Sequence, residues 1–286
     1  MAASRPRRLW PVGCLVVALV LISAVVGTFA WLRNLGVASP VPGEQRCVAT
    51  AGKSSVALSL NQAHFTSIIV GLSVRRGLAP RAASIAMATA YQETGIRNLD
   101  YGDRDSVGLF QQRPSQGWGS EKQLMDPYYA TGKFYDALVK VDDWEKGDIT
   151  EVAQKVQRSG YPEAYRDHET DGRVLASALT GETPAAFTCL ERQETAGDAA
   201  ALVRSLNKTF GKTGAQREGG VVTIKADSAE LAWAYASHAV ANSGKFGLVT
   251  AEVAGLRWQT DTYQLPRWTS ATPAETTQKT VRLTVR

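Results

Sequence analysis

The sequence contains little of what a metal site needs. Its 286 residues include three cysteines, three methionines and three histidines. The histidines are far apart, at positions 64, 168 and 238, and the cysteines form no close pair along the chain. Because metal ions are usually held by clustered Cys and His ligands, a metal-binding protein or metal transporter has little support. We expect no metal or organic cofactor.

The central part of the chain also lacks a basic stripe. The net charge is +5, with four basic and no acidic residues in 1–43, 17 basic and 20 acidic in 44–195, and 11 basic and seven acidic in 196–286. Nucleic-acid-binding domains cluster Lys and Arg on one face, so nucleic acid is not an expected partner. The composition is otherwise that of a globular protein, long enough for one to three domains.

Long apolar runs are absent except at the start. Residues 10–32 carry no charge, and a span of about 20 apolar residues crosses the hydrocarbon core of a bilayer. Residues 1–9 contain three arginines, which favours a cytoplasmic N-terminus. We therefore expect a cytoplasmic tail (1–9), a transmembrane helix (10–32) and a linker (33–52). The protein would be a single-pass cell-membrane protein with most of its chain extracytoplasmic.

A cleaved signal peptide is the competing interpretation of this run. Gly36-Val37-Ala38 offers the small residues of a cleavage site. The apolar region of a signal peptide is usually about 7–15 residues, shorter than the run observed here. The length therefore favours an uncleaved anchor.

The first candidate catalytic residue is Glu93. Residues 79–92 have the pattern of a helix, which would place Glu93 at its C-terminal end, and Gly108-Leu109-Phe110-Gln111 begins 15 residues later. The helix dipole and partial burial would both raise the pKa of a carboxyl at that place. A carboxylic acid held beside polar amides can protonate a glycosidic oxygen. A lone Glu at a helix end is more often simply solvated, and the second motif favours the functional interpretation.

Glu93-Thr94-Gly95 followed by Gly108-Leu109-Phe110-Gln111 resembles the E-S-G … G-L-M-Q signature of lysozyme-like soluble lytic transglycosylase (SLT) domains. The resemblance covers roughly residues 51–189. The stretch from Tyr101 to Gly119 is most similar to the membrane-anchored subgroup of actinobacteria and their phages. It implies a mainly α lysozyme-like domain, over residues 53–190, that acts on peptidoglycan.

The resemblance also implies roles for particular residues. Glu93 would be the catalytic acid, and Tyr135, which matches the tyrosine of the third family motif, would orient it. Tyr128 stands where that motif has Asn, and only Gly160 clearly matches the family's Y-N-A-G element. Trp118 either stacks on a sugar or packs its loop onto the core. The expected substrate-binding residues are Gly108, Leu109, Phe110, Gln111, Gln112, Trp118, Gln157 and Tyr161.

Cys47 and Cys189 bracket the lysozyme-like segment. Two such cysteines outside the cytoplasm are expected to form a disulfide. The alternative is a pair of separate buried thiols.

Two local features near the motifs carry further expectations. The apolar spacing of Phe65, Ile68, Ile69 and Leu72 predicts a helix with Asn61 as a possible N-cap. Residues 96–113 have no regular period and are expected to be a loop, in which Asp103 and Asp105 could supply a second carboxylate. Their spacing also raises the question of calcium, but the rest of an EF-hand pattern is missing. Salt bridges with Arg104 or Arg97 are favoured.

After a second linker, expected at 191–197, the sequence predicts strands as well as helices. Helices are expected at 199–210 and 228–242, and a last helix before the linker at 172–179. Strands are expected at 221–225, 248–253, 256–259 and 280–285. These elements predict a small α+β domain over residues 198–286, without a recognisable catalytic motif. His238 is expected to be structural.

Two functions remain open from the sequence. The first is a membrane-anchored enzyme, a lytic transglycosylase or muramidase, in which Glu93 cleaves the MurNAc–GlcNAc bond of peptidoglycan. The second is a weakly active or inactive peptidoglycan-binding scaffold of an envelope, secretion or conjugation complex. The expected partners are glycan strands, the bilayer through residues 10–32 and an envelope protein through residues 198–286.

Overall fold

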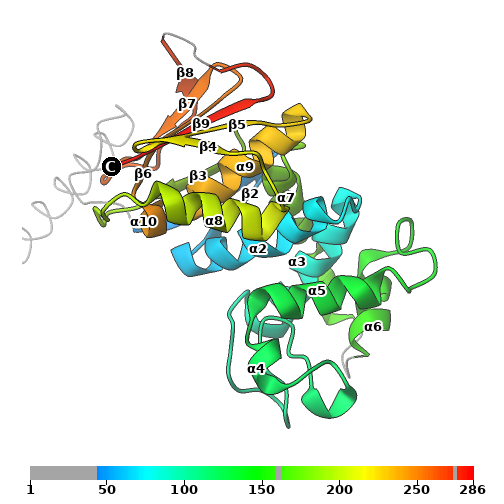
Figure 1. Ribbon diagram of the computed structural model, residues 1–286. Coiled ribbons are helices and arrows are strands. Elements are labelled where there is room, and N and C mark those ends of the chain that lie inside the picture. Colours follow the sequence, from blue (N-terminus) through cyan, green and yellow to red (C-terminus); the bar gives the residue numbers. More distant parts are fainter. Residues whose placement is uncertain (1–43, 159–162, 273–275) are drawn as a thin grey trace, which may run out of the picture. The chain divides into compact units, whose positions relative to one another are not determined.

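The computed structural model describes residues 44–158, 163–272 and 276–286 (Figure 1). The predicted tail (1–9), membrane helix (10–32) and first part of the linker (33–43) lie outside the described residues. Within the described ranges, no helix is both long and apolar enough to cross a bilayer. Residues 44–286 form one unit, and its helices and antiparallel sheets make it a mixed α and β structure.

A group of helices occupies the first two thirds of this unit. Their bounds are α2 (Leu60–Arg75), α3 (Pro80–Thr94), α4 (Glu121–Leu124), α5 (Pro127–Leu138), α6 (Ile149–Gln157) and α7 (Glu169–Thr180), with the short 3-10 helices η1 (Pro114–Gln116) and η2 (Ala164–His168). Helix α3 contacts α2, α5, α6, η2 and α7. Its middle is rich in buried alanine, which lets the neighbouring helices approach closely.

Gly172 shows how close the contact between α3 and α7 is. A Cβ added at this position would collide with the carbonyl oxygen of Ser84 on α3. Glycine is therefore required where α7 crosses α3. The core around the two helices is continuous and includes Ile85, Met87 and Leu175, all fully buried.

The cap of helix α2 lies two residues before the predicted N-cap. Ser59, not Asn61, caps it: the Gln62 backbone N–H donates to Ser59 Oγ at 3.2 Å, and the Ser59 N–H donates to Gln62 Oε1 at 2.8 Å. This reciprocal capping box satisfies two backbone donors that a cap at Asn61 would leave open.

A small sheet that the sequence did not predict packs beside these helices. It comprises β1 (Arg46–Ala51), β2 (Ser54–Leu58) and β3 (Phe187–Leu190), in the order β2-β1-β3 and antiparallel throughout. Residues 46–51, expected as part of the linker, thus form its central strand. Cys47 and Cys189 face each other across β1 and β3, and the predicted disulfide between them is confirmed.

The last third of the chain forms a larger sheet with helices. The helices are α8 (Ala199–Phe210), α9 (Ala229–Ala241) and α10 (Ser243–Phe246). The antiparallel strands are ordered β4-β5-β9-β6-β7-β8, with bounds β4 (Gln216–Glu218), β5 (Val221–Lys225), β6 (Leu248–Val253), β7 (Leu256–Gln259), β8 (Thr269–Ser270) and β9 (Thr280–Val285).

The longer elements of this part were predicted correctly. Strand β9 alternates as expected, with Val281, Leu283 and Val285 buried, and α9 packs against β6 and β9 (Figure 1). The short elements β4, β8 and α10 were not predicted, because two to four residues carry too little periodicity.

Helices from the two predicted domains meet in one buried polar network. On the α2 side, His64 Nδ1 lies 2.6 Å from Asn242 Oδ1, and Ser67 Oγ accepts from Asn242 Nδ2 at 3.1 Å. Asn242 Nδ2 also donates to the His238 carbonyl, and His238 Nε2 lies 2.9 Å from Ser205 Oγ on α8. His238 is fully buried in this network. The domain boundary at 191–197 stays a prediction.

Candidate active site

Glu93 lies in the last turn of α3. The helix ends at Thr94, and Gly95 adopts the left-handed conformation, with φ 61°, that commonly closes a helix. The Gly95 N–H donates to the Tyr91 carbonyl at 2.8 Å, and the Gln62 side chain donates to the Gly95 carbonyl at 2.8 Å. The backbone that carries Glu93 is therefore held on both sides.

Two side chains from elsewhere in the fold donate to the Glu93 carboxyl. The Tyr165 hydroxyl donates to Oε1 at 2.6 Å, and Gln157 Nε2 donates to the same oxygen at 3.2 Å. Tyr165 comes from η2 and Gln157 is the last residue of α6. Because both bonds end on Oε1, the other oxygen, Oε2, is the one on which a proton can be carried without displacing either donor.

Burial governs the titration of this carboxyl. Glu93 is half-buried, and the loss of solvent raises its pKa, while the hydrogen bonds from Tyr165 and Gln157 act to lower it. Burial is the larger effect, so the net pKa is raised. The negative end of the α3 dipole acts in the same direction. The protonated acid therefore persists to a higher pH than that of a solvated glutamate.

The Gly108–Gln111 turn is fixed beside the end of α3. Gly108 has φ 80°, and a Cβ there would collide with the Leu124 carbonyl oxygen. Thr94 Oγ1 donates to the Leu109 carbonyl at 3.1 Å, and Gln157 Nε2 donates to the Phe110 carbonyl at 2.7 Å. Gln157 thus joins the turn to Glu93 through a single amide.

Most side chains of this turn are packed in the core and are not free to contact a ligand. Leu109 and Phe110 are fully buried, and Phe110 stacks on Phe134 with ring centroids 4.6 Å apart. Gln112 is also buried and donates to the Ala130 carbonyl at 3.2 Å. Of the side chains from Leu109 to Gln112, that of Gln111 is the one that is only partly buried.

The Tyr135 hydroxyl bonds to a partner other than Glu93. Tyr135 is fully buried, and its hydroxyl donates to the Ile69 carbonyl on α2 at 2.9 Å. Burial raises the pKa of this hydroxyl strongly. The tyrosine hydroxyl that contacts the Glu93 carboxyl is instead that of Tyr165, which was not among the predicted site residues. Tyr165 lies 72 residues from Glu93, and no local pattern marks it.

The other two aromatic candidates have different outcomes. Trp118 is partly buried and packs against the core, and its carbonyl accepts from the Tyr129 hydroxyl at 3.3 Å. This contact corresponds to the packing alternative. Tyr161 lies outside the described residues.

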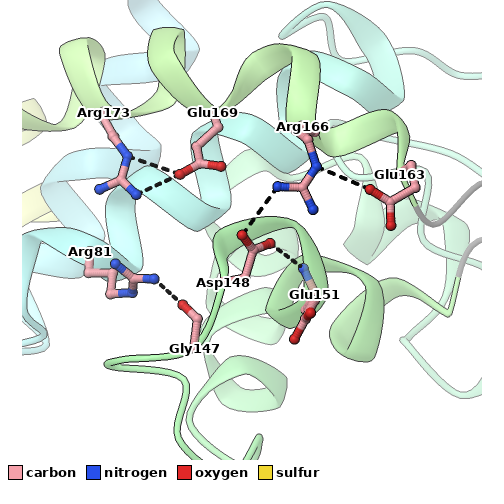
Figure 2. Close-up of polar contacts among 8 residues, drawn as sticks. All are labelled: Arg81, Gly147, Asp148, Glu151, Glu163, Arg166, Glu169 and Arg173. Atoms are coloured by element: carbon pink, nitrogen blue, oxygen red, sulfur yellow. Dashed lines mark hydrogen bonds and ion pairs between the residues drawn. The ribbon is translucent and has the colours of Figure 1, made fainter.

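Charged contacts hold the two segments that carry the donors to Glu93 (Figure 2). Arg166, next to Tyr165, contacts Glu163 at 3.1 Å and Asp148 at 3.2 Å. Asp148 is the N-cap of α6 and accepts from the Glu151 N–H at 3.1 Å. Arg166 therefore ties η2 to the start of the helix that ends in Gln157. Nearby, Arg173 pairs with Glu169 on α7 and Arg81 donates to the Gly147 carbonyl.

The loop carboxylates are used inside the loop. Asp105 Oδ1 accepts from Arg113 Nε at 2.8 Å, and Oδ2 accepts from the Ser115 N–H at 2.7 Å. Arg113, followed by Ser115, holds the pKa of Asp105 well below its usual range. Its ion-pair partner is thus Arg113, neither of the two arginines that were expected. Asp103 is 91% exposed and forms an ion pair with Arg104, one of the two expected partners, at a distance of 3.9 Å.

In the part of the chain that the structure describes, His, Cys, Asp and Glu side chains form no group of three that could hold a metal ion.

The comparisons with known proteins add no family to this geometry. No protein-family model matches the chain, and no curated protein matches it.

Proposed function

We propose that the protein is a peptidoglycan-cleaving enzyme of the lytic transglycosylase type, with a lysozyme-like domain in which Glu93 is the general acid and base. The observation that carries this proposal is the half-buried Glu93 carboxyl, whose pKa is raised by burial and whose Oε1 is held by Tyr165 and Gln157. A general acid needs a raised pKa and a fixed orientation. Burial raises the pKa of Glu93, and the two hydrogen bonds fix the orientation of its carboxyl.

The proposed reaction uses one carboxyl twice. Glu93 first donates its proton to the glycosidic oxygen between MurNAc and GlcNAc, and the bond from C1 of MurNAc to that oxygen breaks. The carboxylate then removes the proton of the MurNAc C6 hydroxyl, whose oxygen bonds to C1. The products are a free hydroxyl on the leaving sugar and a 1,6-anhydro ring, and Glu93 is protonated again.

The contacts of the loop carboxylates Asp103 and Asp105 support this route over hydrolysis. Hydrolases of glycosides normally use two carboxyls on either side of the bond. Asp105 is committed to Arg113 and Ser115, and Asp103 projects into solvent. An internal nucleophile, the C6 hydroxyl, removes the need for a second carboxyl.

Cell-wall cleavage by the full-length protein tests the proposal. Purified sacculi are incubated with the wild type, with Glu93→Gln and with Glu169→Gln, and released fragments are identified by mass spectrometry. The control replaces a partly buried glutamate that pairs with Arg173 on α7. We expect anhydro fragments from the wild type and the control and none from Glu93→Gln. Equal release by Glu93→Gln would refute the role of this residue, and binding without release would favour a scaffold.

The localisation and partners are part of the same proposal. The uncharged run at 10–32 would anchor the protein in the cell membrane and hold the enzyme outside the cytoplasm, where its glycan substrate lies. Residues 198–286 would offer a surface to an envelope protein.

A further inference from the structure

Tyr101 is an exposed aromatic residue in the loop between Glu93 and the Gly108–Gln111 turn. Its side chain is 67% exposed, and the other strongly exposed large hydrophobic residues in the described ranges are Val139 and Tyr263. Single exposed apolar residues are common on protein surfaces. Exposure alone therefore does not indicate a binding role. Tyr101 is of interest because its loop is attached to the candidate active site.

The backbone at Tyr101 is fixed onto the turn. Gln111 Nε2 donates to the Tyr101 carbonyl at 3.3 Å, and a Cβ at Gly102 would collide with the amide oxygen of Gln111. On the other side, the Gly108 N–H donates to the Leu99 carbonyl at 2.7 Å. The loop on both sides of Tyr101 is thus anchored to residues 108–111.

The same turn is joined to the proton donor. Gln111 follows Phe110, whose carbonyl accepts from Gln157 at 2.7 Å, and Gln157 also donates to Glu93 at 3.2 Å. A short series of contacts therefore fixes the backbone of Tyr101 relative to the Glu93 carboxyl.

We propose that Tyr101 is a sugar-binding residue, on whose ring one pyranose of the glycan strand stacks, in a subsite next to the bond that Glu93 protonates. The C–H face of a pyranose is apolar and matches the face of an aromatic ring. Tyrosine offers a large contact area and has only two side-chain torsions to immobilise. The inference rests on the proposed function, since it takes a peptidoglycan glycan strand as the ligand.

Two charged residues that follow Tyr101 in the chain could hydrogen-bond the hydroxyls of the same sugar. Asp103 and Arg104 follow within three residues, with side chains 91% and 71% exposed. They form a long ion pair of 3.9 Å, and both side chains remain largely exposed to solvent. An aromatic ring for the apolar face and polar side chains for the hydroxyls form a binding arrangement without a catalytic group.

Binding measurements on an inactive background test the inference. The full-length Glu93→Gln protein is titrated by calorimetry with a peptide-free tetrasaccharide of alternating GlcNAc and MurNAc. Adding Tyr101→Ala should weaken binding about tenfold, because one ring face is no longer buried. Tyr101→Trp should retain binding. The matched control is Tyr263→Ala, which removes an equally exposed tyrosine (69%) between β7 and β8 and should leave the affinity unchanged.

A kinetic measurement separates this inference from the proposed function. In the protein with Glu93 intact, Tyr101→Ala should raise KM and leave kcat nearly unchanged, as expected for binding that is uniform along the reaction. The inference is overturned if Tyr101→Ala and Tyr263→Ala bind the tetrasaccharide equally, or if the Glu93→Gln parent does not bind it. If binding depends on Tyr101 but the wild type releases nothing from sacculi, the subsite stands and the catalytic proposal fails.

Discussion

The network around His64 makes a prediction about acid stability. His64 on α2 contacts Asn242 at 2.6 Å, and Asn242 Nδ2 donates to Ser67 and to the His238 carbonyl. Asn242 Oδ1 is therefore the acceptor, and His64 Nδ1 carries the proton. Burial, with the positive charge of Lys245 as the second cause, lowers the pKa of His64 to about 4.

The sign and size of the effect follow from linkage. Between pH 6.5 and about 4, the unfolded chain binds a proton at this histidine and the folded protein does not. Stability is therefore lost as the pH falls through this window. At about 1.4 kcal/mol per pKa unit, His64 alone accounts for a loss of about 3 kcal/mol. Burial lowers the pKa of His238 to about 3, which adds to the loss.

The test compares His64→Gln with the wild type by urea unfolding from pH 7 to pH 4. Glutamine can still donate to Asn242 but does not titrate, so the variant should lose about 1 kcal/mol at pH 7. It should then overtake the wild type as the pH falls. Ser67→Ala is the control, because it removes a hydroxyl from the same network without removing a titrating group. Its curve should run parallel to that of the wild type. A parallel curve for His64→Gln would refute the reasoning.

Two further predictions concern the site and the disulfide. Tyr165→Phe removes a hydrogen bond that lowers the pKa of Glu93, so the alkaline limb of the pH–activity profile should move to higher pH; movement to lower pH would contradict the assignment of Tyr165. Replacing Cys47 and Cys189 by serine should lower the free energy of unfolding by about 2–5 kcal/mol in urea titrations. A reductant should lower the free energy of unfolding of the wild type to that of the variant, whose own value should not change. A difference that persists under reduction would contradict this.

Periodic elements were the part of the fold that the sequence made predictable. The strand at 280–285 and the helix at 199–210 match the structure, since alternating or helical spacing reflects burial directly. The β2-β1-β3 sheet was missed because β3 lies more than 130 residues beyond β1 in the chain, and no local pattern indicates such a pairing. The disulfide was predicted from compartment and position, but its place across two paired strands was not.

In the candidate site, too, features encoded by neighbouring residues were predictable, and contacts between residues far apart in the chain were not. Glu93 could be placed at a helix end because the helix pattern of residues 79–92 and the glycine at 95 are local. Gln157 was predicted as a substrate-binding residue, and in the structure its amide contacts Glu93 and Phe110. Tyr135 was predicted from a motif, yet its hydroxyl donates to Ile69. The hydroxyl on Glu93 comes from Tyr165, brought there by the packing of η2 against α3.

Cleavage of sacculi in water enriched in ¹⁸O tests the central claim most directly. If Glu93 acts first as acid and then as base toward the C6 hydroxyl, wild-type fragments should end in anhydro rings that contain no ¹⁸O, and Glu93→Gln should release none. Fragments that carry ¹⁸O at the new end would contradict the internal transfer. Fragments released equally by Glu93→Gln would contradict the claim that Glu93 is the proton donor.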